Sequence, residues 1–149
     1  FYSEQAVEAG LPALPSYQPL PESDYPLQLR MGRTLTHFHS FYDHGQALPT
    51  LRKHESSPFL WMAPEDAETR SVAHQAAILI FNERGSFAAQ AYVTDKIQQG
   101  TVWMHDGWAG INRLTSGAAS LPDSAVNLFP FGVGQAAFDA AVEVEPLRA

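Results

Sequence analysis

The sequence contains no cysteine, and this absence removes several kinds of chemistry from the chain. Disulfides, zinc fingers, thiolate-bound iron–sulfur clusters and cysteine nucleophiles all need the missing side chain. Long apolar runs are missing too, and residues 1–20 lack the basic start and apolar stretch of a signal peptide. We therefore expect no membrane insertion, and any redox metal chemistry would need residues outside this chain.

Basic residues are few, since nine Lys and Arg stand against sixteen Asp and Glu, a formal charge of −7. This charge repels polyanions and argues against sequence-independent nucleic-acid binding. An anionic ligand would have to be held by a few placed Arg, His and backbone N–H groups in a defined pocket. The chain also lacks Gly-x-Ser-x-Gly, P-loop, dinucleotide Gly-x-Gly-x-x-Gly and His-Glu-x-x-His patterns. We therefore predict no catalytic residue within it.

The 149 residues, 45% of them hydrophobic, are enough for one hydrophobic core. Residues 1–26 contain five prolines, which predict an extended Pro-rich arm or inter-domain segment. Residues 27–149 are expected to form one domain. Because the chain opens on Phe1 rather than Met, we expect the natural protein to begin upstream.

Alternating apolar and polar residues, apolar runs and turn signals predict about six strands and few helices. The predicted strands are residues 27–31, 59–62, 76–81, 86–93, 101–104 and 142–145. Pro64 and the acidic residues after it predict a short helix through about Arg70. Asn82 to Gly85 is read as a hairpin turn in which the glycine can take a positive φ. The domain is therefore expected to be mainly β.

The densest group of polar side chains follows the first predicted strand. Gly32 ends that strand, and residues 33–40 read Arg-Thr-Leu-Thr-His-Phe-His-Ser. In an extended segment Arg33, His37 and His39 would share one side. A guanidinium and imidazoles brought together there could bind a metal, or donate hydrogen bonds to phosphate and heterocycle atoms. The plain alternative is an exposed polar loop with one buried His, and we favour the functional interpretation.

A metal site here would loosely resemble the first motif of cupins, metal-dependent enzymes with a His-x-His pair and a carboxylate. It would use Gly32, His37, His39, Asp43 and Gly45. The spacing fits poorly, Asp replaces the usual Glu, and a second His motif is required. Only His54, His74 and His105 remain for that motif, none in a matching context. The cupin-like enzyme is therefore kept as an alternative.

A second cluster combines aromatic and polar residues between positions 103 and 115. Trp103 lies inside a predicted strand, so we expect it in the core. Trp108, bracketed by glycines that allow close backbone approach, is the better candidate for stacking on a heterocycle. Asn112 can both donate and accept, which suits a purine or pterin edge, although turn chemistry alone would also explain it. The long Gly-, Ser-, Asn- and Pro-rich stretch 106–134 is typical of a functional loop.

Taken in order, these segments resemble the C-terminal molybdopterin-dinucleotide-binding domain of the dimethyl sulfoxide reductase and formate dehydrogenase superfamily. The landmarks are Pro26 to Arg30, Gly32-Arg33 with His37 and His39, Pro64-Glu65-Asp66-Ala67, Asn82 to Gly85, Val93-Thr94, Gly100-Thr101-Val102, and Asn112 with Leu114-Thr115. No single landmark is specific. The ordered series, which covers nearly the whole chain, carries the resemblance.

The resemblance implies a six-stranded double-psi β-barrel with short helices. It also implies a bis(molybdopterin guanine dinucleotide) cofactor with molybdenum or tungsten, whose metal ligand lies outside this chain. By motif position, the main cofactor-binding residues would be Gly32, Arg33, Thr34, Leu35, Thr36, His37, His39 and Ser40. A second wall would be formed by Trp108, Asn112, Gln135 and Phe138. The implied partners are upstream catalytic domains of the same parent chain and an iron–sulfur electron-transfer subunit.

Two departures from the family pattern stand out. Relatives often have glycines after the short helix, where this chain has Ser71 and Gln75, which leaves room for a remodelled turn. Relatives also often carry a Lys near the final strand, where Asp139 stands here. The hypotheses are thus a cofactor module of a molybdenum or tungsten oxidoreductase, a cupin-like enzyme, or a purely structural barrel. The substrate, the choice of metal and the compartment, cytoplasmic or periplasmic, stay open.

Overall fold

The computed structural model describes residues 4–8, 10–14, 17, 22–35, 49–115 and 140–148. Its contacts divide the chain into two units. The first unit comprises Phe1–Glu22 and Gly117–Ala137, and its described secondary structure is the short helix α1 (Glu4–Glu8). The second comprises Ser23–Ser116 and Phe138–Ala149 and holds all the strands described below.

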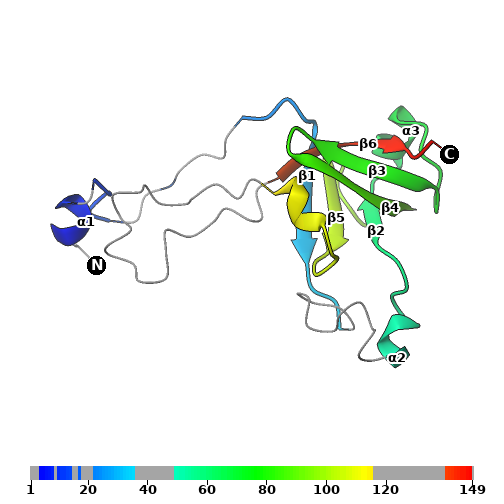
Figure 1. Ribbon diagram of the computed structural model, residues 1–149. Coiled ribbons are helices and arrows are strands. Elements are labelled where there is room, and N and C mark those ends of the chain that lie inside the picture. The colour runs from blue at the N-terminus through cyan, green and yellow to red at the C-terminus, as the bar shows by residue number, and fades with distance from the viewer. Residues whose placement is uncertain are drawn as a thin grey trace. The chain divides into compact units, whose positions relative to one another are not determined.

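Six strands of the second unit close into a barrel in the order β1-β5-β2-β4-β3-β6 (Figure 1). They are β1 (Leu27–Gly32), β2 (Phe59–Met62), β3 (Ala77–Asn82), β4 (Gly85–Val93), β5 (Thr101–His105) and β6 (Ala140–Pro146). Each lies where the alternation predicts it, and the mainly β, six-stranded barrel is confirmed. Short helical segments in this unit are α2 (Pro49–Arg52), α3 (Pro64–Thr69) and the 3-10 helix η2 (Ile111–Leu114). No helix among the described residues is long and apolar enough to cross a bilayer.

Strand directions decide which loops meet at each end of the barrel. β1 runs parallel to β5, so Gly32 pairs with His105. β2 is antiparallel to β5, and β6 is antiparallel to β1. The ends of β1 and β5 and the beginnings of β2 and β6 therefore lie at one end of the barrel, which we call the Gly32 end.

The barrel interior is filled by alternate residues of the strands, as the two-residue period of a strand requires. Examples buried to 1% exposure or less are Leu27, Leu29, Leu60, Met62, Ile78, Ile80, Val102, Met104 and Val142. Each such side chain stabilises the fold by about 1.5–3 kcal/mol relative to an exposed position. This closed core holds the strand ends, and hence the loops that follow them, in place.

Helix α3 has the expected proline and acidic first turn, but Asp66 does more than complement the helix dipole. Its side chain is 5% exposed, and its Oδ2 accepts the backbone N–H of Gly100 at 2.8 Å. Arg70 caps the helix and pairs with Glu143 on β6. These contacts tie the connector α3 to the turn before β5 and to the closing strand.

The expectation that the hairpin turn uses a positive φ at its glycine is wrong. Gly85 does not take a positive φ, and a Cβ at that position would lie 3.2 Å from Cβ of Arg113. The glycine therefore serves close packing rather than turn geometry. After α3, Ser71 (φ 55°) and Gln75 (φ 65°) both adopt the left-handed conformation that suits glycine. The backbone there keeps a glycine-type conformation, although neither residue is glycine.

Candidate functional site

The two segments predicted to bind a cofactor leave the barrel side by side at the Gly32 end. The carbonyl oxygen of Gly32 accepts the N–H of Asp106 at 2.8 Å, which extends the parallel β1–β5 pairing past the strands. Residues 33–35 and 106–112 therefore begin as neighbours, although they are far apart in the sequence. Parallel pairing of β1 and β5 is the cause, because parallel strands end at the same edge.

In the first segment, Arg33 and Leu35 are exposed and Thr34 is half-buried. Leu35 is 98% exposed, so its side chain is available to a ligand or another surface. Gly32 is crowded by Trp103 instead, because a Cβ there would lie 2.9 Å from the indole Nε1. The predicted contacts of Thr36, His37, His39 and Ser40 lie outside the described residues.

In the second segment, Trp108 is half-buried, packs against the hydrophobic core and lies 5.0 Å from the ring of His105. Asn112 is exposed on η2. That helix is anchored by buried Ile111 and Leu114 and follows Gly110, which has a φ of 94°. The anchoring holds Asn112 at a fixed place beside the barrel.

The remaining predicted residues have different outcomes. Gln135 and Phe138 lie outside the described residues, although Ala140, two positions after Phe138, begins β6 at the Gly32 end. Trp103 was expected in the core, and this expectation is wrong. Its neighbours Val102 and Met104 point into the barrel, so Trp103 is half-buried on the outer face. The two-residue period gives strand faces but does not say which face is inside.

One pair at this end was not found from the sequence. His105 is 4% exposed, and its Nε2 lies 3.5 Å from Oε2 of Glu55. Glu55 precedes β2, so the pair links the start of β2 to the end of β5. No local signal marks the contact, because it joins residues brought together only by barrel closure.

Asn82, at the end of β3, fixes η2 to the barrel. Its buried amide donates hydrogen bonds to the carbonyl oxygens of Leu114 at 2.8 Å and Ala141 at 3.1 Å. Its Oδ1 accepts the N–H of Arg84 at 3.0 Å. The guanidinium of Arg84 donates to the same Leu114 oxygen, at 2.9 Å and 3.1 Å. The segment carrying Asn112 is therefore held by side chains of the β3–β4 hairpin.

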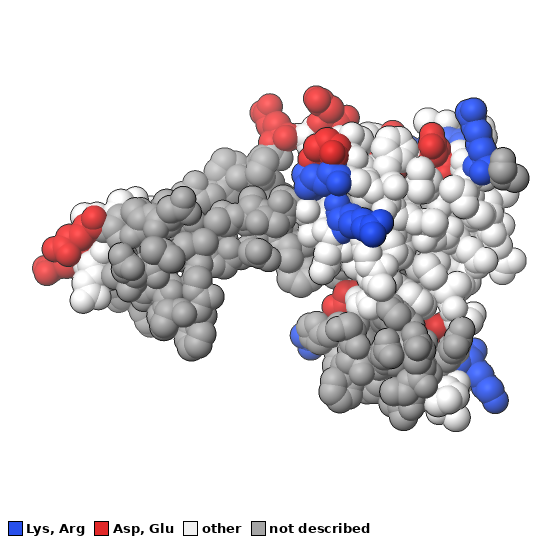
Figure 2. Space-filling view, viewed as in Figure 1, with Lys and Arg blue, Asp and Glu red and all other residues white. Residues whose placement is uncertain are grey.

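Arg84 and Arg113 place two cations beside η2 in a chain that is acidic overall. Arg113 lies against Gly85, the first residue of β4. Figure 2 shows Lys and Arg side chains together on the left part of the barrel, with Asp and Glu next to them and along the upper edge. Glu83 pairs with Arg84, so the local excess is the charge of Arg113, and such an excess attracts anions even where the net charge is negative. Sequence reading missed these two arginines because they belong to separate segments.

The described histidines do not form a metal centre. His105 faces Glu55, and Nδ1 of His74 accepts the N–H of Val93 at 3.2 Å. Among the residues that the structure describes, no three His, Asp or Glu side chains cluster as metal ligands. His37, His39 and Asp43 lie outside that part of the chain. The six-stranded barrel with two parallel pairs also differs from the eight-stranded jelly roll of cupins.

Comparison with known families decides between the remaining hypotheses. A family model described as "Molydopterin dinucleotide binding domain" matches residues 27–129. The chain belongs to this family. The match covers β1 to β5, both segments at the Gly32 end and η2. It supports the cofactor-binding interpretation, and nothing in it supports the cupin-like alternative.

Relatives of the molybdopterin-dinucleotide-binding family are much longer proteins. The chain is 29% identical over 148 residues to the probable oxidoreductase YoaE of Bacillus subtilis, covering 97% of this chain and 21% of that protein. It is 31% identical over 101 residues to a formate dehydrogenase alpha subunit of Methanocaldococcus jannaschii, covering 66% and 15%. Acetylene hydratase from Pelobacter acetylenicus shares the fold, with a TM-score of 0.70 and 19% identity over 98% of this chain and 23% of that one. The chain thus spans about a fifth of such relatives.

The described residues fit the family's ligand. A dinucleotide presents phosphate oxygens and heterocycle edges, which need cationic and mixed donor–acceptor side chains. Arg33 and Asn112 are exposed on neighbouring segments, and Arg84 and Arg113 flank the second of them. Trp108 adds an aromatic surface next to His105. The Gly32 end therefore offers the donor set that this cofactor requires.

Proposed function

We propose that this chain binds and orients a bis(molybdopterin guanine dinucleotide) cofactor as the C-terminal domain of a larger molybdenum or tungsten oxidoreductase. One observation carries the proposal: within the family match, the segments starting at Arg33 and Asp106 leave the same end of the barrel as neighbours. A ligand held between two segments is fixed in place and orientation. Positioning is the protein's share of cofactor chemistry.

Each side chain has a separate role in this proposal. Arg33 donates charge-assisted hydrogen bonds to phosphate oxygens, because a guanidinium can bind two such oxygens in bidentate geometry. Asn112 donates to and accepts from a heterocycle edge. Thr34, Leu35 and Trp108 would contact the ligand between the two segments. The bound metal centre supplies the electron or oxygen-atom transfer, and this chain supplies affinity, orientation and shielding from water.

The parent protein is proposed to carry the metal ligand and the substrate residues in upstream domains. The length of the relatives, of which this chain covers about a fifth, supports such domains. An iron–sulfur electron-transfer subunit is a further proposed partner, consistent with the absence of cysteine here. The division of the chain into a Pro-rich arm, residues 1–26, and a domain, residues 27–149, remains a prediction.

The test is a titration of the metal-free chain with molybdopterin guanine dinucleotide, together with metal analysis. We expect an Arg33→Ala, Asn112→Ala double variant to bind at least tenfold more weakly, because a hydrogen bond to a charged group contributes about 1.5–3 kcal/mol and a neutral one about 0.5–1.5 kcal/mol. Arg148→Ala, which removes an exposed cation beyond the other end of β6, is the matched control and should bind like wild type. The full-length parent carrying the double variant should also lose pterin nucleotide on purification. Retention of one equivalent of iron, manganese or zinc by the chain, with no nucleotide binding, would contradict the proposed function.

A further inference from the structure

A row of large side chains crosses the outer wall of the barrel. Trp103 on β5 pairs in register with Arg30 on β1 and with Trp61 on β2, and Trp61 pairs with Tyr92 on β4. The row thus spans four adjacent strands. The ring centroids of the two tryptophans are 5.3 Å apart, and those of Trp61 and Tyr92 are 5.1 Å apart. All four side chains point outward, since the residues next to them in each strand fill the barrel.

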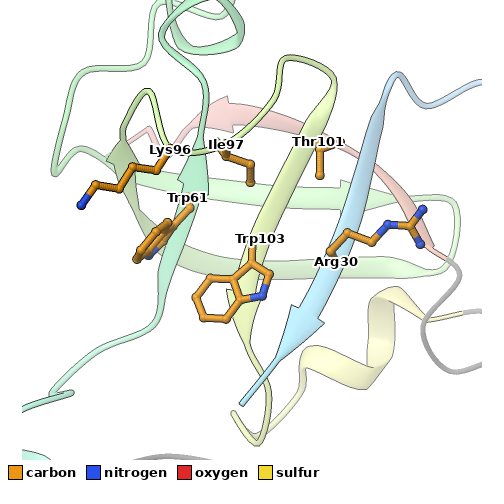
Figure 3. Close-up of a pocket in the computed structure, with 6 residues that line it drawn as sticks. All are labelled: Arg30, Trp61, Lys96, Ile97, Thr101 and Trp103. Atoms are coloured by element: carbon orange, nitrogen blue, oxygen red, sulfur yellow. The ribbon is translucent and has the colours of Figure 1, made fainter. Parts of the chain in front are cut away.

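The middle of this row forms a groove of about 360 Å³. Its lining residues are Arg30, Trp61, Lys96, Ile97, Thr101 and Trp103. Figure 3 shows the two indoles at the centre, with Lys96 and Arg30 on opposite sides and Ile97 and Thr101 along one edge. We call this surface the tryptophan groove. Thr101 begins β5, so the groove extends away from the Gly32 end, which it meets where Trp103 crowds Gly32.

Two cations, Arg30 and Lys96, lie at the sides of the groove. Arg70 and Arg84 are both paired with carboxylates, whereas Arg30 and Lys96 form no ion pair with any described residue. Both cations are exposed. In Figure 3 their side chains point in opposite directions, away from the indoles. They therefore do not converge on one small anion, and they suit a longer partner with negative charge at both ends.

The composition of the groove is that of a protein–protein contact. Tryptophan, tyrosine and arginine are enriched at the centres of interfaces, where they contribute most of the binding energy. Half-buried indoles beside aliphatic side chains offer such a centre, and the two cations form its rim. A second copy of this chain is a poor partner, because two chains of charge −7 repel each other.

We propose that the tryptophan groove binds a segment of the upstream polypeptide of the same parent protein, with an apolar centre flanked by acidic residues. This inference rests on the proposed function, in which the chain is one domain of a longer oxidoreductase. About four fifths of the relatives' length lies outside the matched region, so an intramolecular partner is present at high effective concentration. The contact would attach the cofactor-binding barrel to the other domains without using the Gly32 end.

Two measurements on the full-length parent test the groove. A photo-crosslinking amino acid is placed at position 97, and the crosslinked peptide is identified by mass spectrometry. We expect a peptide of the same chain, upstream of this domain, that contains acidic residues around an apolar centre. Hydroxyl-radical footprinting should show several-fold higher oxidation of Trp61 and Trp103 in an Arg30→Glu, Lys96→Glu variant than in wild type. Arg148→Glu reverses an exposed cation outside the groove and should leave the oxidation unchanged.

Other results would overturn the inference. Crosslinks to a second copy or to another protein would show that the groove has a different occupant. The absence of any crosslinked peptide would show that no polypeptide binds there. Equal tryptophan oxidation in wild type and in the double charge reversal would exclude a contact that depends on these cations. The pterin nucleotide and metal contents of the same preparations are measured in parallel. A parent protein that lacks the cofactor would contradict the proposed function. A parent protein that contains the cofactor but has an unoccupied tryptophan groove would contradict this inference alone.

Discussion

The indole nitrogen of Trp103 lies over Gly32, only 2.9 Å from where a Cβ of that residue would stand. Such a distance leaves no room for any other residue at position 32 unless the indole moves. Gly32 is also the last residue of β1, and its carbonyl oxygen accepts the N–H of Asp106 at 2.8 Å. One glycine therefore links the tryptophan groove to the start of the proposed cofactor loop.

The first prediction is that Gly32→Ala displaces the Trp103 indole. Overpacking of this kind typically costs about 1–3 kcal/mol of stability, which denaturant unfolding would measure. Tryptophan fluorescence should also shift, because the ring leaves its contact with Trp61. In a Trp103→Phe background, which lacks the indole nitrogen, the same alanine should cost less than half as much. Equal costs in both backgrounds would show that crowding by the indole is not the reason for the glycine.

The strands could be predicted from the sequence because alternation is a local property. The β3–β4 hairpin is an example, since its strands are adjacent in sequence and pair from Asn82 and Gly85 onward. The position of β5 between β1 and β2 could not be predicted in this way, because it depends on contacts across more than 40 residues. The misplaced Trp103 has the same origin. A large apolar residue in a strand suggests burial, but barrel closure turned Val102 and Met104 inward instead.

The candidate site could be predicted only in part, for a similar reason. Arg33 and Asn112 were predicted as cofactor-binding residues because each belongs to a motif of consecutive residues. The Glu55–His105 pair and the contact of Arg84 with Leu114 join separate segments, so no local pattern indicated them. The turn after α3 could be predicted only in part. The glycines of relatives indicated a turn there, but the sequence did not show that Ser71 and Gln75 would adopt the left-handed conformation.

The second prediction is that Ser71→Gly and Gln75→Gly each stabilise the protein. The left-handed conformation costs an L-residue about 1–2 kcal/mol, and glycine avoids that cost. Glycine in turn lowers the stability by roughly 0.5–1 kcal/mol, because it loses more conformational entropy on folding. A net gain of about 0.5–1 kcal/mol per position is expected in denaturant unfolding. Ala88→Gly, at an exposed position inside β4, should instead destabilise by a similar amount. Loss of stability at position 71 or 75 would contradict the strain argument.

The third prediction concerns Asn82, whose buried amide donates to the carbonyl oxygens of Leu114 and Ala141. Asn82→Ala should cost about 1–3 kcal/mol, because a buried carbonyl group loses its donor. Asn82→Asp should cost more at pH 7, since a carboxylate would then face two carbonyl oxygens. Amide hydrogen exchange of η2 should rise in both variants, because Asn82 fixes that helix to the barrel.

The two Asn82 variants should differ in their response to pH. Burial and the facing carbonyl oxygens would raise the pKa of the carboxyl group in Asn82→Asp above its unfolded value. The nearby Arg84 guanidinium opposes this rise only weakly, because it is already bonded to the Leu114 oxygen and paired with Glu83. A raised folded-state pKa means that stability is lost as pH rises through it and recovered as pH falls. The difference in melting temperature from wild type should therefore become smaller on acidification for Asn82→Asp. For Asn82→Ala this difference should stay constant. A parallel response of the two variants would mean that the carboxyl group does not face these oxygens.

The fourth prediction tests whether the arginines beside η2 contribute to nucleotide binding. Arg113→Ala removes an exposed cation next to Asn112 and should weaken dinucleotide binding about three- to tenfold, or roughly 0.7–1.4 kcal/mol. The difference from wild type should shrink at high salt, since screening removes the advantage of the charge. Arg148→Ala is the control, because Arg148 is exposed beyond the other end of β6. If Arg113→Ala binds like wild type at low salt, the phosphate groups do not lie near η2, and Arg33 on the opposite segment becomes their main cationic partner.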